Sequence, residues 1–268
     1  MRLTRVFIDG ALTPGAIVEL ARDTASHLAK VLRARSGDEL ILFNGDGREF
    51  TGAIEAVRGS RVSASIGAAR SIDRESSLAL TLLQCVPRGD RMDFIVQKAT
   101  ELGVGRIVPV LSRRSVVRLD EAQAASKQAH WRAVAVSACE QCGRNRLPTV
   151  DAPQPLLNYL GAINPKETPG LLRLVLEPER AARAQQGARP VDTHAAGPVT
   201  GADIAIGPEG GFAPEELEAF ELSAFSRLGL GPRVLRTETA AIAAIVVLQA
   251  RFGDMSAVSD DSSRTEDA

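Results

Sequence analysis

The spacing of hydrophobic and polar positions changes near residue 72 of the chain. Before that point, short runs with a period of two predict strands at 2–8, 39–43, 48–57 and 61–67. The turn sequences Asn-Gly-Asp-Gly at 44–47 and Arg-Gly-Ser at 58–60 separate the later strands. A short helix fits between residues 24 and 35, with His27, Leu28, Val31 and Leu32 on one face. Short strands at this spacing predict a small β-barrel.

After residue 78 the apolar runs are continuous, which is typical of parallel strands that are covered on both faces. Such runs lie at 78–86, 106–111, 171–176 and 204–206, and a last short strand is predicted at 228–230. Helical periodicity separates them at 90–102, with Asp90 as the predicted cap, and at 120–142. A further helix is predicted to begin at Pro214. Alternating strands and helices predict an α/β domain with a mainly parallel sheet.

The last predicted helix, at 239–251, is apolar on nearly every face. Such a helix is expected to be buried all round, either at the centre of the domain or in a subunit interface. The segment that follows, 254–268, is rich in Ser and Asp and is predicted to be a disordered acidic tail. The polar stretch at 71–77 is the predicted boundary between domains at 1–72 and 73–253.

The charges are unevenly distributed, although the 268 residues carry a formal net charge of only -1. Residues 86–146 hold eleven Lys and Arg against six Asp and Glu, a surplus of five positive charges that suits an anionic partner. Three cysteines, an odd number, favour a reducing compartment over a disulfide framework. Neither a signal peptide nor an apolar run of about 20 residues is present. We therefore expect a cytoplasmic protein with no membrane partner.

Two glycine-rich segments near the end of the chain predict a ligand pocket. Gly-Pro-Glu-Gly-Gly at 207–211 follows the predicted strand 204–206, and Gly-Leu-Gly-Pro-Arg-Val-Leu-Arg-Thr-Glu-Thr-Ala at 229–240 leads into the apolar helix. Glycine lets a backbone approach a ligand closely. Ligands of parallel sheets bind beyond the carboxyl ends of the strands, where these segments and Leu-Glu-Pro at 176–178 would meet. The sequence thus predicts a pocket with three walls.

Several common sites are excluded by their missing motifs. Neither Gly-x-Gly-x-x-Gly after the first strand nor a Walker A sequence occurs, and Gly-x-Ser-x-Gly is also absent. No Cys and His cluster suits zinc, so no metal site is expected. Cys139 and Cys142 have the spacing of a redox pair, but they lie late in a predicted helix and are interpreted as small apolar residues.

Six segments resemble one known family. They are Arg-Val-Phe at 5–7, His-Leu-Ala-Lys-Val-Leu-Arg at 27–33, Lys-Ala-Thr-Glu-Leu-Gly-Val at 98–104, Glu140-Gln141 with Arg144 and Pro148, 206–212 and 229–240. With them the sequence resembles the bacterial 16S ribosomal RNA uracil-N3 methyltransferases of the SPOUT class. Two features depart from the family: Arg88 stands where a lysine is expected, and the alanine-rich loop at 180–200 is long.

The resemblance implies a trefoil-knotted α/β domain, a PUA-like RNA-binding domain at 1–72 and a homodimer. It also implies S-adenosylmethionine as the methyl donor and 16S ribosomal RNA or the small ribosomal subunit as the partner. By position, the residues implied to bind the cofactor are Leu176, Glu177, Ile206, Gly207, Glu209, Gly211, Leu230, Gly231, Leu235, Thr239 and Ala240. Leucines beside glycines suit an adenine ring, which needs apolar walls and backbone hydrogen bonds.

Arg236 and Glu238 are the candidate catalytic residues. The ring nitrogen of uracil is a weak acid, so it must lose its proton before it attacks a methyl donor. Glu238 or Glu209 could accept that proton, and Arg236 could stabilise the uracil anion through its carbonyl oxygens. The structural alternative for Glu238 is a carboxylate that interacts with the helix dipole, with Arg236 as its salt-bridge partner.

Basic residues in both domains are the candidate RNA contacts, and the alternative for each single residue is a solvated surface side chain. They are Arg5, His27, Lys30, Arg33, Arg88, Arg91, Arg113 and Arg114. Two other functions remain open at this point. The chain could methylate a ribose 2′-hydroxyl, which requires a base near a hydroxyl, or it could be a non-catalytic RNA-binding dimer.

Overall fold

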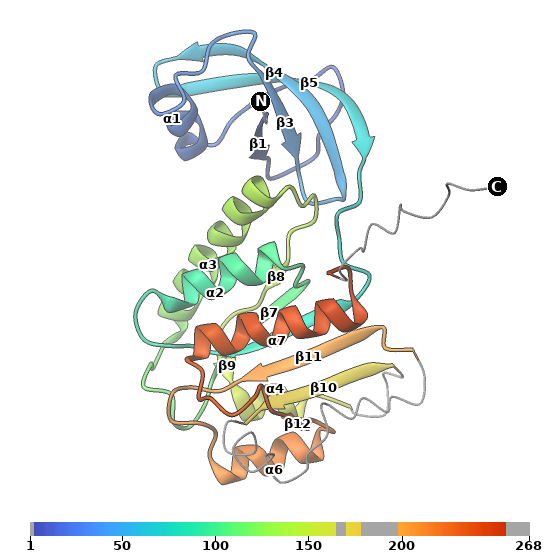
Figure 1. The fold of residues 1–268 in the computed structure, drawn as a ribbon. Coiled ribbons are helices and arrows are strands. Elements are labelled where there is room, and N and C mark those ends of the chain that lie inside the picture. The colour runs from blue at the N-terminus through green and yellow to red at the C-terminus, as the bar shows by residue number, and fades with distance from the viewer. Residues whose placement is uncertain (1–2, 165–169, 178–197, 256–268) are drawn as a thin grey trace, which may run out of the picture. The chain divides into compact units, whose positions relative to one another are not determined.

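The computed structural model describes residues 3–164, 170–177 and 198–255. The chain forms two compact units, one from Met1–Glu75 with Ala129–Thr149 and the other from Ser76–Gln128 with Val150–Ala268 (Figure 1). The sequence suggested a single crossing between domains near residue 72. Instead the chain returns to the N-terminal unit at 129–149, after it has begun the C-terminal one.

The N-terminal unit is built on a five-stranded sheet in the order β1-β3-β4-β5-β2. Strands β1 and β3 are parallel, and the other pairs are antiparallel. The short strand β2 is absent from the sequence prediction, because three residues carry too little periodicity to detect. The elements of this unit are β1 (Thr4–Phe7), β2 (Ile17–Glu19), α1 (Arg22–Lys30), β3 (Glu39–Phe43), β4 (Arg48–Arg58) and β5 (Arg61–Ser71).

Helix α1 is shorter than the sequence predicted, and it has a different apolar face. Leu28 is buried, whereas Val31 and Leu32 lie beyond the helix and are 64% and 48% exposed. Arg33 then takes a left-handed φ of 52°, which turns the chain away from the helical direction. The prediction that Val31 and Leu32 pack beside Leu28 was therefore wrong.

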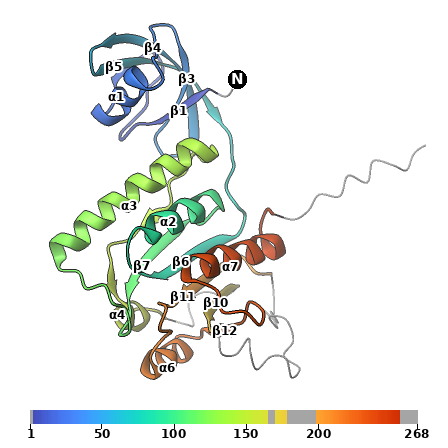
Figure 2. The same cartoon turned by 60° about the vertical axis from the view of Figure 1, so that its left-hand side comes forward.

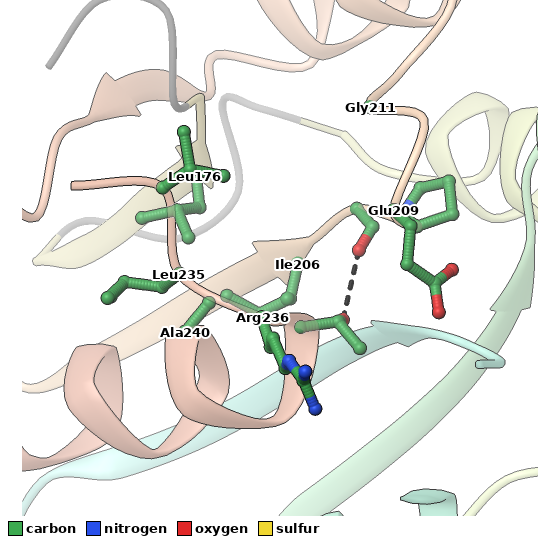
Figure 3. A pocket seen from close by; sticks show the side chains of 11 residues that line it. Leu176, Ile206, Glu209, Gly211, Leu235, Arg236 and Ala240 are labelled. Carbon is green, nitrogen blue, oxygen red and sulfur yellow. Dashed lines mark hydrogen bonds between the residues drawn. The ribbon is translucent and has the colours of Figure 1, made fainter. Parts of the chain in front are cut away.

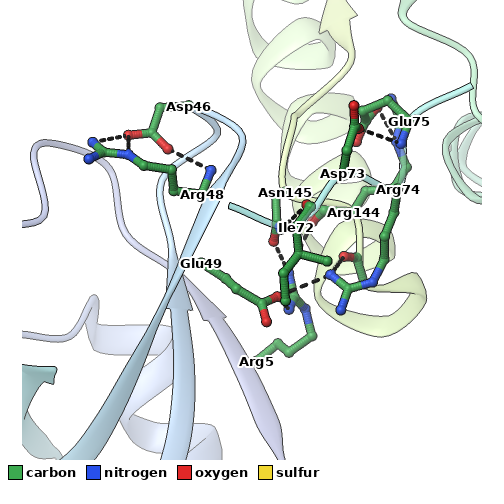
Figure 4. A network of polar contacts seen from close by, with 11 residues as sticks. Arg5, Asp46, Arg48, Glu49, Ile72, Asp73, Arg74, Glu75, Arg144 and Asn145 are labelled. Atoms are coloured by element: carbon green, nitrogen blue, oxygen red, sulfur yellow. Dashed lines mark hydrogen bonds and ion pairs between the residues drawn. The ribbon is translucent and has the colours of Figure 1, made fainter. Parts of the chain in front are cut away.

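A buried polar network joins the segment 129–149 to the N-terminal sheet (Figure 4). The Nη1 atom of Arg5 donates to Glu49 at 2.7 Å, and its Nη2 atom donates to the side chain of Asn145 at 2.6 Å. Asn145 in turn donates to the carbonyl of Ile72 at 2.9 Å. Arg5 and Glu49 each keep only 6% of their side-chain surface exposed. These long-range contacts have no local pattern, which is why the sequence alone did not place this segment.

The C-terminal unit contains a parallel sheet in the order β12-β10-β11-β6-β7-β8, with β9 also paired to β7. Helices α2 and α7 cover one face of this sheet, and α4 and α6 cover the other (Figures 1 and 2). The strands are β6 (Ala79–Cys85), β7 (Arg106–Leu111), β8 (Thr149–Val150), β9 (Gln154–Pro155), β10 (Leu171–Leu176), β11 (Gly201–Ile206) and β12 (Ser226–Leu228). The helices are α2 (Arg91–Glu101), α4 (Leu156–Gly161), α6 (Pro214–Leu222) and α7 (Thr237–Phe252). Helix α3 (Glu121–Cys142) begins in this unit and belongs to the N-terminal unit from Ala129 onward.

Two predictions about these helices need correction. Asp90 occupies the cap position of α2, but its side chain makes no capping hydrogen bond. Helix α7 begins two residues earlier than predicted, and Val247 on its outer side is 43% exposed in the single chain. A position at the centre of the domain is therefore excluded, and burial in a subunit interface stays a prediction. One side of α7 packs against α2 and β11, and a second layer over its outer side is absent from the described part of the chain.

Two sequence predictions fall largely outside the described residues. They are the loop at 180–200, of which 180–197 are not described, and the tail at 254–268, of which 256–268 are not described. The trefoil knot stays a prediction, because strand order does not define how a chain is threaded. None of the described helices has the length and apolar character needed to cross a bilayer.

Candidate functional site

The carboxyl ends of three neighbouring strands define a pocket in the C-terminal unit. Strands β12, β10 and β11 are adjacent and parallel, so the loops after Leu228, Leu176 and Ile206 leave the sheet at the same edge. The pocket has a volume of about 240 Å³. Its lining consists of Leu176, Ile206, Gly207, Pro208, Glu209, Gly211, Val234, Leu235, Arg236, Thr237 and Ala240.

The lining separates into an apolar side and a charged side (Figure 3). Leu176, the last residue of β10, and Leu235, in the loop before α7, lie on the apolar side. Glu209 and Arg236 present a carboxylate and a guanidinium on the other side. A ligand with an apolar ring at one end and charged groups at the other would match this division.

Glycine is required at two points of the loop after β11. Gly211 has a left-handed φ of 67°, a conformation that costs other residues free energy. Its N–H donates to the carbonyl of Pro208 at 2.9 Å and closes a tight turn. At Gly207, a Cβ atom would lie only 3.1 Å from the ring of Phe212, so a side chain there would press on the buried ring. The loop therefore presents its backbone to the pocket.

The start of α7 forms the wall opposite this loop. Arg236 occupies the N-cap position in an extended conformation, and its carbonyl accepts the first helical hydrogen bond from Ala240 at 2.8 Å. The Oγ1 atom of Thr237 donates to the carbonyl of Gly207 at 3.0 Å, the bond drawn in Figure 3. This bond joins the two glycine-rich segments that the sequence singled out.

The two candidate catalytic residues differ in their surroundings. The guanidinium of Arg236 is exposed at the pocket and makes no ion pair or hydrogen bond within the described part of the chain. Glu238 does not line the pocket, and its Oε2 atom is buried without a hydrogen-bond partner in those residues. The suggested salt bridge between Arg236 and Glu238 is absent, so that explanation for Arg236 was wrong. Glu238 does lie in the first turn of α7, where a carboxylate interacts favourably with the helix dipole.

Seven of the residues expected to bind a cofactor line the pocket: Leu176, Ile206, Gly207, Glu209, Gly211, Leu235 and Ala240. Glu177, Leu230, Gly231 and Thr239 do not. Glu177 instead forms an ion pair with Arg227 of β12 at 2.9 Å, and the side chain of Thr239 is exposed. Sequence reasoning left out three lining residues, Pro208, Val234 and Thr237, although each lies inside a quoted motif.

Two candidate RNA contacts of the C-terminal unit, Arg91 and Arg114, contact the Gly-Pro-Glu-Gly-Gly loop. Arg91, the first residue of α2, pairs with Glu209 of the pocket at 2.5 Å, and both side chains are roughly half exposed. Arg114 donates to the carbonyl of Gly210 at 2.9 Å, and its charge is one of the causes that lower the pKa of the neighbouring Glu215. Arg88 is exposed, and no carboxylate pairs with it among the described residues. These cations give the pocket edge next to α2 a positive character.

Arg113 contacts the start of α6 rather than the pocket. Its guanidinium pairs with Glu215, and its backbone N–H donates to Glu216 at 2.7 Å. The pKa of Glu215 is lowered by the hydrogen bond from its own backbone N–H, and also by the charge of Arg113. Arg113 therefore stabilises the start of α6, and its charge is already paired with the carboxylate of Glu215.

In the N-terminal unit, one of the four candidate RNA contacts was assigned wrongly. Arg5 is 9% exposed and engaged with Glu49 and Asn145, so it is a structural residue of the buried network. His27, Lys30 and Arg33 are exposed on α1 or just after it. Their positions leave them accessible to a polyanion.

Metal coordination is not supported by the described residues, in which no three His, Cys, Asp or Glu side chains gather as a metal site would require. Cys85, Cys139 and Cys142 are free thiols. Burial raises the pKa of Cys85, and a hydrogen bond with Cys142 together with burial raises that of Cys139, so neither thiol has the thiolate character of a reactive cysteine.

Comparisons with known proteins identify the family. Residues 74–249 match the RNA methyltransferase domain, and residues 20–66 match the RNA methyltransferase PUA domain. Ribosomal RNA small subunit methyltransferase E of Buchnera aphidicola is 31% identical over 255 residues, which cover 95% of this chain and 99% of that protein. A solved methyltransferase E from Neisseria gonorrhoeae, bound to S-adenosyl methionine, is 35% identical with a TM-score of 0.81, covering 95% of this chain and all of that one.

A second solved structure agrees with these relatives in fold and in bound molecule. It is a protein from Legionella pneumophila, described as a methyltransferase in complex with the cofactor SAM. It is 38% identical, with a TM-score of 0.84 and coverage of 95% of this chain and 100% of that one. With matching family domains in both units and relatives that align over nearly the whole length, the chain belongs to the ribosomal RNA small subunit methyltransferase E family.

Proposed function

We propose that this protein transfers a methyl group from S-adenosylmethionine to the N3 atom of a uridine in 16S ribosomal RNA of the small subunit. The observation that carries the proposal is the pocket at the ends of β10 and β11, where an exposed Arg236 stands beside an apolar wall. Its family relatives with the same fold bind S-adenosylmethionine. The composition of the pocket supports the same cofactor for this chain.

The residues of the pocket fit the donor. Leu176, Ile206 and Leu235 supply apolar surface for an adenine ring. Gly207 and Gly211 line the pocket with backbone atoms rather than side chains, so a donor can approach the backbone closely there. Glu209 can pair with the amino group at the charged end of the donor, as it now pairs with Arg91. Leu230 and Gly231, which lie outside the lining, would reach the donor only through a shift of their loop.

S-adenosylmethionine, when bound, supplies a methyl group on a sulfonium, which is already activated for in-line displacement. The protein must therefore align the two reactants, which can contribute up to roughly 7–11 kcal/mol, and remove the uracil proton. Arg236 holds its guanidinium where it can stabilise negative charge on a uracil carbonyl oxygen. Glu209 and Glu238 are the candidate proton acceptors, and the Oε2 atom of Glu238 has no competing donor among the described residues.

RNA would be held by cations on both units. In the N-terminal unit these are His27, Lys30 and Arg33. In the C-terminal unit they are Arg88, which is exposed, and Arg114, whose guanidinium donates to the backbone carbonyl of Gly210. Arg91 would have to leave Glu209 to bind a phosphate, an exchange that costs little because half-exposed ion pairs contribute about 0–1 kcal/mol.

We further propose that the protein is a cytoplasmic homodimer. Val247 on the outer side of α7 is apolar and 43% exposed, and burying what remains exposed is worth roughly 1 kcal/mol. A second copy seated on α7 would cover it. Light scattering on the purified chain tests the assembly, and a monomeric mass at micromolar concentration would refute this part of the proposal.

The reaction is tested with small ribosomal subunits, and separately with naked 16S ribosomal RNA, from cells that lack the modification. The purified protein is incubated with each substrate and labelled S-adenosylmethionine, and the RNA is digested to nucleosides. We expect label in 3-methyluridine. Label in 2′-O-methyl nucleosides would show the ribose reaction instead. Calorimetry that detects no binding of the donor at millimolar concentration would favour a non-catalytic RNA-binding dimer.

A further inference from the structure

A buried glutamine behind the pocket connects its two glycine-rich walls. Gln84 lies near the end of β6, is 0% exposed and is in register with Ile206 of β11. Its Nε2 atom donates to Oγ1 of Thr237 at 2.9 Å and to the carbonyl of Cys85 at 2.9 Å. Thr237 then donates to the carbonyl of Gly207 at 3.0 Å. Gln84 itself does not line the pocket.

The chain of hydrogen bonds has a defined direction. Because the Thr237 hydroxyl accepts a hydrogen from the Gln84 amide, its own hydrogen is directed to the carbonyl of Gly207. The bonds join the end of β6, the loop after β11 and the first residue of α7. These bonds hold the backbone of Arg236, which immediately precedes Thr237, at the pocket edge.

Only the amide nitrogen of Gln84 makes hydrogen bonds within the described residues. Its Oε1 atom is buried and has no hydrogen-bond partner in the described part of the chain. An unpaired buried carbonyl oxygen costs stability, and an apolar side chain of similar length would avoid that cost. Packing alone therefore does not explain a glutamine at this position, because an apolar side chain would fill the space without leaving an unpaired oxygen. The two bonds from Nε2 are the compensating interactions.

We propose that Gln84 is a positioning residue for the methyl transfer. Through Thr237, it holds the Gly207 carbonyl and the N-terminal end of α7 in the geometry in which the donor and the Arg236 guanidinium face each other. The proposal rests on the proposed function. It adds a residue outside the pocket to the groups that set the alignment of the reactants, and misalignment by about 1 Å can reduce a rate about 100-fold.

The test compares Gln84→Met with Leu82→Met, which replaces a fully buried residue two positions earlier on the same face of β6. We expect Gln84→Met to lower the single-turnover rate with saturating donor by about 10–100-fold. Leu82→Met, a volume-conserving change, should stay within about twofold of the wild type. Thr237→Val should match Gln84→Met, and the double variant should be no slower than either single variant. Thr237→Ser, which keeps the hydroxyl, should recover most of the rate that Thr237→Val loses.

A second measurement does not depend on catalysis. Hydrogen exchange of the segments 204–212 and 234–242 should be faster in Gln84→Met than in Leu82→Met, with or without the donor. If the wild type transfers no methyl group, the proposed function fails while this comparison still tests Gln84. A wild-type rate and unchanged exchange in Gln84→Met would overturn the inference. Equal losses in Thr237→Ser and Thr237→Val would also overturn it.

Discussion

Two glycines have nearly the same backbone conformation, but only one of them lines the pocket. Gly211 has φ 67° and lines the pocket, whereas Gly231 has φ 82° and does not. A Cβ atom added at either glycine would meet no atom within 4 Å. Gly211→Ala and Gly231→Ala therefore introduce the same backbone strain without a steric clash, and only the first perturbs the pocket wall.

The expected loss of stability follows from the backbone alone. A left-handed conformation destabilises the folded state by roughly 1–2 kcal/mol when the residue is alanine. Alanine also lowers the entropy of the unfolded chain, which offsets about 0.4–1 kcal/mol of that loss. Each variant should lose about 1 kcal/mol, which for a domain of this size lowers Tm by roughly 2–4 °C. If Gly211→Ala relieves its strain by moving the loop away from the donor, its Kd for S-adenosylmethionine should rise about tenfold, equivalent to about 1.4 kcal/mol.

Thermal unfolding and titration calorimetry on the two variants separate strain from binding. Similar Tm values with a weaker donor affinity in Gly211→Ala alone would agree with the described pocket. If Gly231→Ala lowered the affinity for the donor as much as Gly211→Ala, the pocket would have to include the loop at 229–232, as the sequence first suggested. If neither variant changed the affinity, the loop after β11 would not contact the donor.

Three further predictions concern catalysis, acid stability and RNA binding. Arg236→Ala should reduce single-turnover methyl transfer by about 100-fold or more with little change in donor Kd, and equal losses would place Arg236 in cofactor binding instead. The pKa of Glu49 is lowered because, against the effect of burial, hydrogen bonds from Arg5 and Arg74 favour the carboxylate. The ionised Glu49 therefore stabilises the folded protein at pH values above 4.5, its ordinary pKa. This stability is lost as the pH falls through the lower pKa of Glu49 in the folded state. Glu49→Gln should destabilise the protein by up to about 3–5 kcal/mol at pH 7 and flatten the acid limb of Tm against pH; an unchanged acid limb would contradict this. Arg88→Ala should reduce the salt dependence of RNA binding by about 0.7 in the slope of log K against log salt, and an unchanged slope would remove Arg88 from the interface.

The sequence was most informative where local periodicity and turn chemistry decide the structure. The strands at 106–111 and 171–176 were predicted to the residue, because continuous apolar runs bounded by polar residues leave few alternatives. Pro214 was correctly placed at the start of a helix, with Glu216 accepting a hydrogen bond from the N–H of Ala213 at 2.8 Å. Parallel strands also imply that their carboxyl ends meet, and the predicted pocket followed from that rule.

The tertiary structure decided what each of these side chains contacts. Arg5 and Arg88 are alike in sequence as single arginines near a motif, yet one is buried against Glu49 and the other is exposed. Gln84 gave no sequence signal at all, because its partner Thr237 lies 153 positions away. Local patterns report which residues share a face of a helix or strand, and they carry no record of which distant segment packs there. The sequence by itself therefore determined the family, the two kinds of sheet and the motifs of the pocket. The assignment of cations to ion pairs or to solvent, and the bonds that hold the pocket walls together, depended on long-range packing.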